Sequence, residues 1–161
     1  MREMKKEKLK THVLMLSKKF VGNHPKKGQD TDFIQKIANG FKIHTIRLNC
    51  ELWKKRIDEV NQGKAVISLR QWIDKPYRSK QEAIKIITKG LVGYEVMNLS
   101  KLSTEEELTH IAGNDGLSKE DFIAWFGGMD EVMKDKEVVV IHFTDFRYSD
   151  LVLLQENEEK Q

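Results

Sequence analysis

The strongest constraint on the fold is the apolar run EVVVIHFTDF at residues 137–146. Its β-branched and aromatic residues favour a strand over a helix. A strand this apolar suits a position where both of its faces are covered. We therefore expect it at the centre of a sheet or barrel.

The other elements are predicted from hydrophobic spacing and from turn residues. Strands cluster along the chain rather than alternating regularly with helices, which favours an α+β fold over a doubly wound one. We expect a curled, mixed or antiparallel sheet with short helices around it. The predicted strands are 12–16, 41–48, 65–72, 82–90 and 91–99, the last two separate or joined in one bent strand; the predicted helices are 31–38, 51–64 and two that open at Ser103 and Ser118 with capping patterns.

Length and composition predict one soluble domain. The chain has 161 residues, 39% hydrophobic and 33% charged, enough apolar material for a single core. No apolar run reaches the roughly 18–20 residues that span a bilayer. The basic N-terminus leads only into VLML, too short for the apolar part of a secretion signal. We expect a cytoplasmic protein without membrane contact.

Charge is unevenly distributed along the chain. Residues 1–27 hold nine Lys/Arg and two Glu, whereas residues 149–161 hold four acids and one Lys. We expect a basic arm at 1–11, a domain at 12–148 and a frayed acidic tail at 149–161. The arm can attract a polyanion such as RNA, or it can simply be a solvated terminus.

Cysteine and histidine usage argues against a metal or cofactor site. Cys50 is the only cysteine, so neither an internal disulfide nor a zinc ribbon can form. The five histidines are scattered and none has a second ligand at metal-binding spacing. We predict no metal and no cofactor.

Three polar residues follow a helix-ending glycine in the segment GFKIHTIR, residues 40–47. Thr45 and Arg47 share one face of a strand because side chains alternate. Lys42 is three residues from Thr45, so it reaches the same face only if the strand begins near His44. We expect Gly40 to permit that irregular backbone.

This segment resembles the signature of the ASCH domain family, part of the PUA-like superfamily. The signature is glycine, any residue, lysine, two residues, glutamate or threonine, one residue, arginine, and Gly40, Lys42, Thr45 and Arg47 fill it. Later segments, GKAVISLR and IAGNDGLSKEDFIAWFG, are also similar, so the resemblance spans roughly residues 12–148. It implies a small β-barrel with short helices around it, a cleft lined by the motif, and RNA or modified nucleosides as ligands.

One branch that the chain resembles, the bacterial N4-acetylcytidine amidohydrolases, uses the lysine and threonine of this signature and a later carboxylate. The resemblance implies Lys42 and Thr45 for the first two and Asp115 for the third, where that branch has glutamate. Arg70 matches a strand arginine of the same branch. The shorter aspartate side chain leaves open whether the activity is kept.

The chemistry of these residues fits amide hydrolysis. Thr45, or a water beside it, can be the nucleophile if Lys42 acts as the base, which needs its pKa lowered by burial and by Arg47. Asp115 can protonate the leaving amine or orient water, and Arg47 or Arg70 can stabilise an oxyanion or hold a phosphate. Each residue could instead have a structural role. Lys42 could complement the helix dipole at a C-terminus, and Thr45 could be present because threonine favours strands. Arg47 could form an ion pair with Glu51, and Asp115 could belong to a turn.

His44 and the aromatic residues have two interpretations each. His44 can shuttle a proton at the ligand site or be a satisfied structural histidine. Trp53 and Trp125 lie on apolar helix faces, which predicts core positions. A basic loop holds aromatics among positive charges and predicts a nucleic-acid rim made of Trp72, Lys75, Tyr77 and Arg78.

The sequence therefore predicts an ASCH-type, PUA-like domain that binds RNA or a modified nucleoside or nucleotide. One alternative is an amidohydrolase acting on N4-acylated cytidine. Another is a non-catalytic module that contacts a protein partner.

Overall fold

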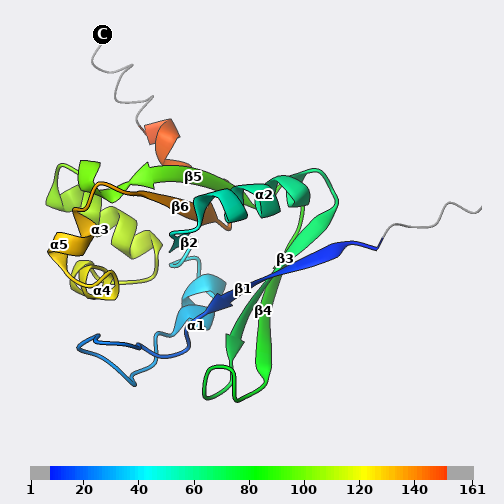
Figure 1. Ribbon diagram of the computed structural model, residues 1–161, viewed down its shortest axis with the longest axis horizontal. Coiled ribbons are helices and arrows are strands. Elements are labelled where there is room, and N and C mark those ends of the chain that lie inside the picture. Colours follow the sequence, from blue (N-terminus) through cyan, green and yellow to red (C-terminus); the bar gives the residue numbers. More distant parts are fainter. Residues whose placement is uncertain (1–7, 152–161) are drawn as a thin grey trace, which may run out of the picture.

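The computed structural model describes residues 8–151 and shows a mixed α+β fold (Figure 1). No helix in this part of the chain combines the length and apolar character that a membrane crossing requires. The strands are β1 (Lys10–Leu16), β2 (His44–Arg47), β3 (Ala65–Trp72), β4 (Gln81–Ile87), β5 (Gly93–Asn98) and β6 (Glu137–His142). The helices are α1 (Phe33–Ala38), α2 (Cys50–Asn61), α3 (Glu105–Asn114), α4 (Lys119–Trp125), α5 (Met129–Val132) and the 3₁₀ turn η1 (Leu99–Lys101).

Strand β6 lies at the centre of an antiparallel sheet of order β2-β6-β5. Val138 and Val140 face one hydrophobic core, and Val139, Ile141 and Phe143 face another. Both faces are therefore covered, which explains why the run lacks polar alternation. The predicted central position is confirmed.

The second sheet has the order β1-β3-β4. Strand β1 pairs with β3 in parallel, and β3 pairs with β4 in an antiparallel hairpin with an irregularity between Leu69 and Arg70. The mixed pairing was predicted, but the strands form two small sheets rather than one curled sheet. Within residues 8–151 the pairings do not close them into one barrel. Strands β4 and β5 are separate strands in different sheets.

Helices fill the space on either side of β6. Helix α2 packs against both sheets and buries Trp53, Ile57 and Val60 in the core shared with β1 and β3 (Figure 1). Helices α3 and α4 cover the other side, where Ile111 and Phe122 are fully buried. The predicted core position of Trp53 is confirmed.

Two helix starts, those of α3 and α4, follow local capping chemistry, whereas within residues 8–151 α1, α2 and α5 have no side-chain cap. Ser118 Oγ accepts from the Asp121 N–H at 3.1 Å, as the sequence predicts for α4. Helix α3 begins later than predicted, because Thr104 rather than Ser103 is its N-cap and accepts from the Glu107 N–H. Helix α5 was not predicted, because Gly127-Gly128 just before it resembles a loop.

The chain ends were predicted as a basic arm and an acidic tail. Lys10 and Thr11 of the expected arm already belong to β1. Residues 148–151 form a helical turn, in which the backbone N–H groups of Tyr148 and Ser149 donate to the Glu95 carboxylate. Residues 8 and 9 are exposed and lie outside any strand or helix; residues 1–7 of the arm and 152–161 of the tail lie outside the described residues.

The central position of β6 predicts a large cost for a cavity there. Ile141 is 0% exposed, so Ile141→Ala should lower the free energy of unfolding by about 2–5 kcal/mol. Ile86 on β4 is 58% exposed, so Ile86→Ala should change it by less than about 0.5 kcal/mol. Urea denaturation followed by circular dichroism measures both. Equal costs would contradict the buried position of β6.

Candidate functional site

The backbone after α1 places Lys42 by a tight turn. Gly40 has φ +76°, a left-handed conformation that glycine adopts without strain. The N–H groups of Phe41 and Lys42 both donate to the Lys36 carbonyl, which closes the helix end. The Ile43 N–H then donates to the Asn114 carbonyl at 2.8 Å. The strand begins only at His44, as the motif spacing requires.

Lys42, Thr45 and Arg47 line one cavity together with Asp115. The predicted convergence of the three motif side chains is thus present in the structure, and Asp115 joins it from the end of α3. The cavity volume is about 30 Å³, which is the space of roughly one water molecule. The remaining wall is mostly apolar and consists of Leu16, Ser17, Phe33, Ile46, Trp125 and Phe126.

Lys42 and Asp115 form a buried ion pair. The Lys42 Nζ lies 2.7 Å from the Asp115 carbonyl oxygen and 3.2 Å from its Oδ1. The two side chains are 1% and 8% exposed. Lys42 Nζ also lies 4.3 Å from the centre of the Phe33 ring, a cation–π contact. Such a pair holds its geometry because either charge alone would be costly to bury.

Burial and charge act on the pair in opposite directions. Desolvation lowers the pKa of Lys42, Arg47 lowers it further, and Asp115 counteracts both. For Asp115, burial raises the pKa, but Lys42 and His44 together bring it below its ordinary value. Asp115 therefore stays ionised, while Lys42 loses a proton more easily than a solvated lysine.

The turn after Asp115 packs directly on the Lys42 side chain. A Cβ at Gly116 would lie 3.1 Å from Lys42 Cβ, and the residue has φ +81°. Lys36 Nζ donates to the Gly116 carbonyl at 2.8 Å. Asp115-Gly116 is thus a turn, as its residue types indicate, and Asp115 forms part of the cavity lining.

Arg47 connects the cavity to the other sheet. Its Nη1 donates to Thr45 Oγ1 at 3.1 Å and to the Ile46 carbonyl at 3.2 Å. Its Nη2 donates to the Met15 carbonyl on β1. Because Thr45 Oγ1 accepts from Arg47, the hydroxyl proton of Thr45 is left to donate to another group.

His44 contacts Asp115 but does not line the cavity. Its Nδ1 is 3.3 Å from Asp115 Oδ1, and its Nε2 is 2.6 Å from the Tyr148 hydroxyl. The Tyr148 hydroxyl oxygen accepts from Asn114 Nδ2 at 3.0 Å. His44 therefore does not reach the cavity directly. Its fully buried ring instead holds the Asp115 carboxylate in position.

The direction of this hydrogen-bond chain follows from its donors. The Tyr148 oxygen accepts from Asn114, so its own proton can go to His44 Nε2. With Nε2 accepting, His44 Nδ1 is the ring nitrogen that donates to Asp115 Oδ1. Sequence reasoning missed Tyr148, because it is more than a hundred residues from His44 and has no motif around it.

A second buried histidine lies beside this chain. His142 Nε2 is 2.8 Å from Glu95 Oε1, while its Nδ1 has no partner among the described residues. Burial, with His44 and Arg147 nearby, lowers the pKa of His142 to about 4. His142 is therefore neutral at neutral pH.

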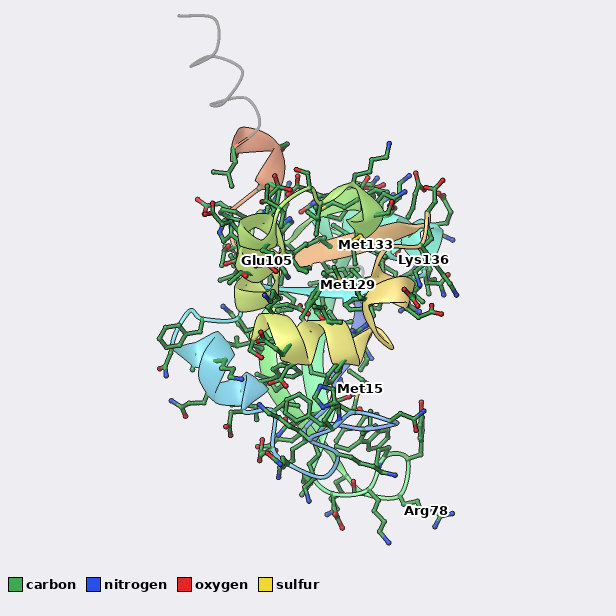
Figure 2. The ribbon with its side chains drawn as sticks, turned by 90° about the vertical axis from the view of Figure 1, so that its left-hand side faces the viewer. Met15, Arg78, Glu105, Met129, Met133 and Lys136 are labelled. Atoms are coloured by element: carbon green, nitrogen blue, oxygen red, sulfur yellow. The ribbon has the colours of Figure 1, made fainter. Side chains whose placement is uncertain are left out.

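A larger groove adjoins the motif cavity. Its volume is about 620 Å³, and Leu16 and Ser17 line both spaces. Of the predicted rim residues, Trp72, Lys75 and Tyr77 line the groove. Arg78 does not, and Figure 2 shows it at the outer end of the β3–β4 hairpin, pointing away from the body of the protein.

Two other predicted residues have different surroundings. Arg70 lies on β3, donates to Ser68 Oγ and Gln81 Oε1, and is not part of the motif cavity. Trp125, predicted as core, packs against the core and also forms part of the cavity wall.

The site has neither a metal-binding group among the described residues nor a match among known proteins. Within residues 8–151, no group of three His, Cys, Asp or Glu side chains is arranged to hold a metal ion. Comparison of the chain with protein-family models, with curated proteins and with solved structures gives no match.

The buried pair predicts strong coupling between Lys42 and Asp115. Asp115→Asn strands a buried ammonium, so it should lower the free energy of unfolding by about 3–5 kcal/mol. Adding Lys42→Met should recover part of this loss, which a double-mutant cycle from urea denaturation at pH 7 measures. The exposed pair Lys134–Glu131 is the control, and its coupling should be below about 1 kcal/mol. Additive effects at Lys42 and Asp115 would show that the pair does not form.

His142 predicts a loss of stability in mild acid. Its pKa is lowered from 6.5 to about 4 in the fold, so the unfolded chain binds its proton first. The contribution of neutral His142 to the free energy of unfolding is therefore fully present above pH 6.5. It is lost as the pH drops toward 4, which lowers the free energy of unfolding by roughly 2–3 kcal/mol. His142→Gln should flatten this slope, whereas the exposed-site variant His110→Gln should keep it. Urea denaturation across this pH range decides, and an unchanged slope in His142→Gln would refute the assignment.

Proposed function

We propose that this chain is an ASCH-type, PUA-like domain whose motif cavity binds the polar edge of a nucleobase. The base would belong to a modified nucleoside, a nucleotide or RNA. The observation that carries the proposal is the convergence of Lys42, Thr45, Arg47 and Asp115 on one buried cavity. Four polar groups gathered inside a mostly apolar wall are typical of a ligand site.

The free hydrogen-bonding groups match a base edge. The Lys42 ammonium uses two of its contacts on Asp115, and the Thr45 hydroxyl proton is not taken by Arg47. Asp115 Oδ2 has no donor among the hydrogen bonds of the described residues, whereas Oδ1 has two partners. Two donors and one acceptor side by side can pair with the ring nitrogen, carbonyl and exocyclic amine of a base such as cytosine.

Charge favours a base over a phosphate in this cavity. Asp115 stays ionised and largely cancels the charge of Lys42. Arg47, the other cation of the lining, already donates to Thr45 Oγ1 and to the carbonyls of Ile46 and Met15. A phosphate oxygen there would lie against a buried carboxylate, which costs free energy. An exocyclic amine would instead donate to it.

The fold supports the proposal at a coarser level. The mixed α+β fold has two small sheets, with α2 packed on both and short helices covering them, and these elements are compatible with a PUA-like domain. We propose that the two sheets correspond to the halves of such a barrel, opened between β1 and β2. The cavity lies at this opening, where Arg47 of β2 donates to Met15 of β1.

Entry of a base requires movement of the cavity wall. A space of about 30 Å³ holds one water-sized group, not a nucleobase. Leu16 and Ser17 separate the cavity from the 620 Å³ groove. Displacement of these residues or of the half-buried Trp125 would join the two spaces, with the sugar in the groove and the base edge in the cavity.

A second candidate function is hydrolysis of an N4-acylated cytidine. The favouring observation is that Lys42, with a lowered pKa, lies 3.2 Å from Asp115 Oδ1 and shares the cavity with Thr45. A neutral Lys42 would take a proton from Thr45 or from a water, whose oxygen then attacks the acyl carbon. As the carbon–nitrogen bond breaks, the Lys42 ammonium returns the proton to N4, giving cytidine. On the Thr45 route, a second water releases the acid from the threonine ester. The one-water volume of the cavity suits the direct water route.

Cytidine and N4-acetylcytidine, added to the full chain, test both candidates. Calorimetry measures binding, and mass spectrometry measures release of cytidine and acetate. Lys42→Ala and Thr45→Ala should weaken binding of both nucleosides by at least about tenfold, since each removes a hydrogen bond from a buried site. The exposed-site variants Lys64→Ala and Thr88→Ala should bind like the wild type.

The outcomes separate the two functions. Binding without turnover supports recognition alone, whereas turnover that Lys42→Ala abolishes supports the amidohydrolase. If neither nucleoside binds the folded wild type, or if the motif variants bind as well as the controls, the proposal is wrong.

A further inference from the structure

The groove beside the motif cavity is built from two segments far apart in the sequence. One wall is residues 15–21 with Lys27 and Gly28, and the other is the tip of the β3–β4 hairpin, residues 72 and 74–77. Lys18 Nζ donates to the Ile73 carbonyl at 3.2 Å and ties the walls together. The groove of about 620 Å³ is a second space, separate from the motif cavity.

Positive charge predominates in the groove. Lys18, Lys19, Lys27 and Lys75 line it, and Asp74 is the one acidic residue in its lining. Arg78 and Lys80 follow on the same hairpin tip and are exposed. A concave surface with several lysines and one carboxylate attracts a polyanion.

Two aromatic rings stand at the hairpin side of the groove. The Trp72 and Tyr77 ring centres are 5.3 Å apart and tilted by 49°. Tyr77 is 88% exposed, which is unusual for so large a ring. The Tyr77 ring is therefore open to water, and a flat ligand can stack on it.

The backbone of the tip holds Tyr77 in this exposed position. Tyr77 has φ +63°, a left-handed conformation that is uncommon for a bulky residue. The turn around it is fixed because Ser79 Oγ accepts from the Asp74 N–H and donates to the Lys75 carbonyl. Observed strain of this kind is concentrated at functional sites.

We propose that this groove binds a single strand of nucleic acid, with a base stacked on Tyr77 and Trp72 and phosphates beside the lysines. The combination of free ring faces and cations is the one by which proteins hold unpaired strands. A duplex keeps its bases stacked on one another and offers none to Tyr77. An acidic peptide would use the lysines but would leave the rings uncovered.

Strand binding in the groove is a function beyond base recognition in the motif cavity, but the two sites are adjacent. Leu16 and Ser17 belong to both linings, so a strand in the groove passes the cavity entrance. If the proposed function holds, the cavity can take a base of such a strand as well as the base of a free nucleoside. The groove itself can bind a strand even if the cavity accepts nothing.

Fluorescence anisotropy with the full chain tests the proposal. The probes are a labelled single-stranded RNA of about 12 nucleotides, a DNA strand of the same sequence, the corresponding RNA duplex, and heparin as a competitor. The variants are Tyr77→Ala and Lys75→Ala, both at exposed positions. Leu91→Ala and Lys89→Ala, exposed in the β4–β5 turn, are the matched controls.

The proposal predicts that the single strand binds more tightly than the duplex. Tyr77→Ala should weaken binding by about five- to 150-fold, the range for one lost base–aromatic stack. Lys75→Ala should reduce the slope of log affinity against log salt by about 0.7, the loss of one phosphate contact on a single strand. The two control variants should bind like the wild type. A preference for RNA or for DNA would assign the natural strand, and either result supports the groove.

Three results would overturn the proposal. The first is equal or tighter binding of the duplex, and the second is unchanged binding by Tyr77→Ala. The third is displacement of the labelled strand by the same heparin concentration in Tyr77→Ala as in the wild type. Heparin has no bases, so loss of the stack should make the strand easier to displace. An unchanged heparin concentration would mean that the groove binds any polyanion through its lysines alone. The same titration in Lys42→Ala keeps the two proposals apart, since groove binding should survive there even where nucleoside binding at the cavity is absent.

Discussion

The structure of the site depends on one interaction, the buried ion pair of Lys42 and Asp115. Isolated charges are costly to bury, so these two side chains must stay together in the fold. Their contact joins the turn after α1 to the end of α3, segments 73 residues apart in the chain. The same contact aims the remaining polar groups of both residues at one cavity.

The rest of the fold can be understood as support for this pair. Strand β6 is covered on both faces and holds β2 in register, so Thr45 and Arg47 sit on a rigid element. Behind the pair, Tyr148 and His44 fix the Asp115 carboxylate, and Gly116 lets the turn pack on the lysine stem. A cavity fixed in this way is preorganised but closed, so access of the proposed ligand depends on the side chains at its mouth.

Local features were predictable from the sequence because their causes are local. The apolar run of β6, the glycine at position 40 and the Ser118 cap each follow from a few neighbouring residues. Alternation along a strand also led to the expectation that Lys42, Thr45 and Arg47 share one hollow, since the strand had to begin near His44.

Long-range contacts were not predictable in the same way. The division into two sheets depends on which strands pair, and β1 pairs in parallel with β3 across more than fifty residues. The contact of Tyr148 with His44 spans an even longer separation and has no periodic signal. Asp115 was placed at the site only by family resemblance, and its distance from Lys42 came from the structure. Nor does composition show that the cavity is only as large as one water.

Lysine side-chain NMR on the full chain is the most direct measurement of the central claim. With ¹³C at the lysine Cε and Lys42→Arg to assign its signal, Lys42 should titrate at a lower pH than the exposed lysines, because burial lowers its pKa. On addition of N4-acetylcytidine, its signal should shift more than that of any other lysine. A Lys42 signal that titrates with the surface lysines and does not respond to the nucleoside would contradict a buried pair at a ligand site.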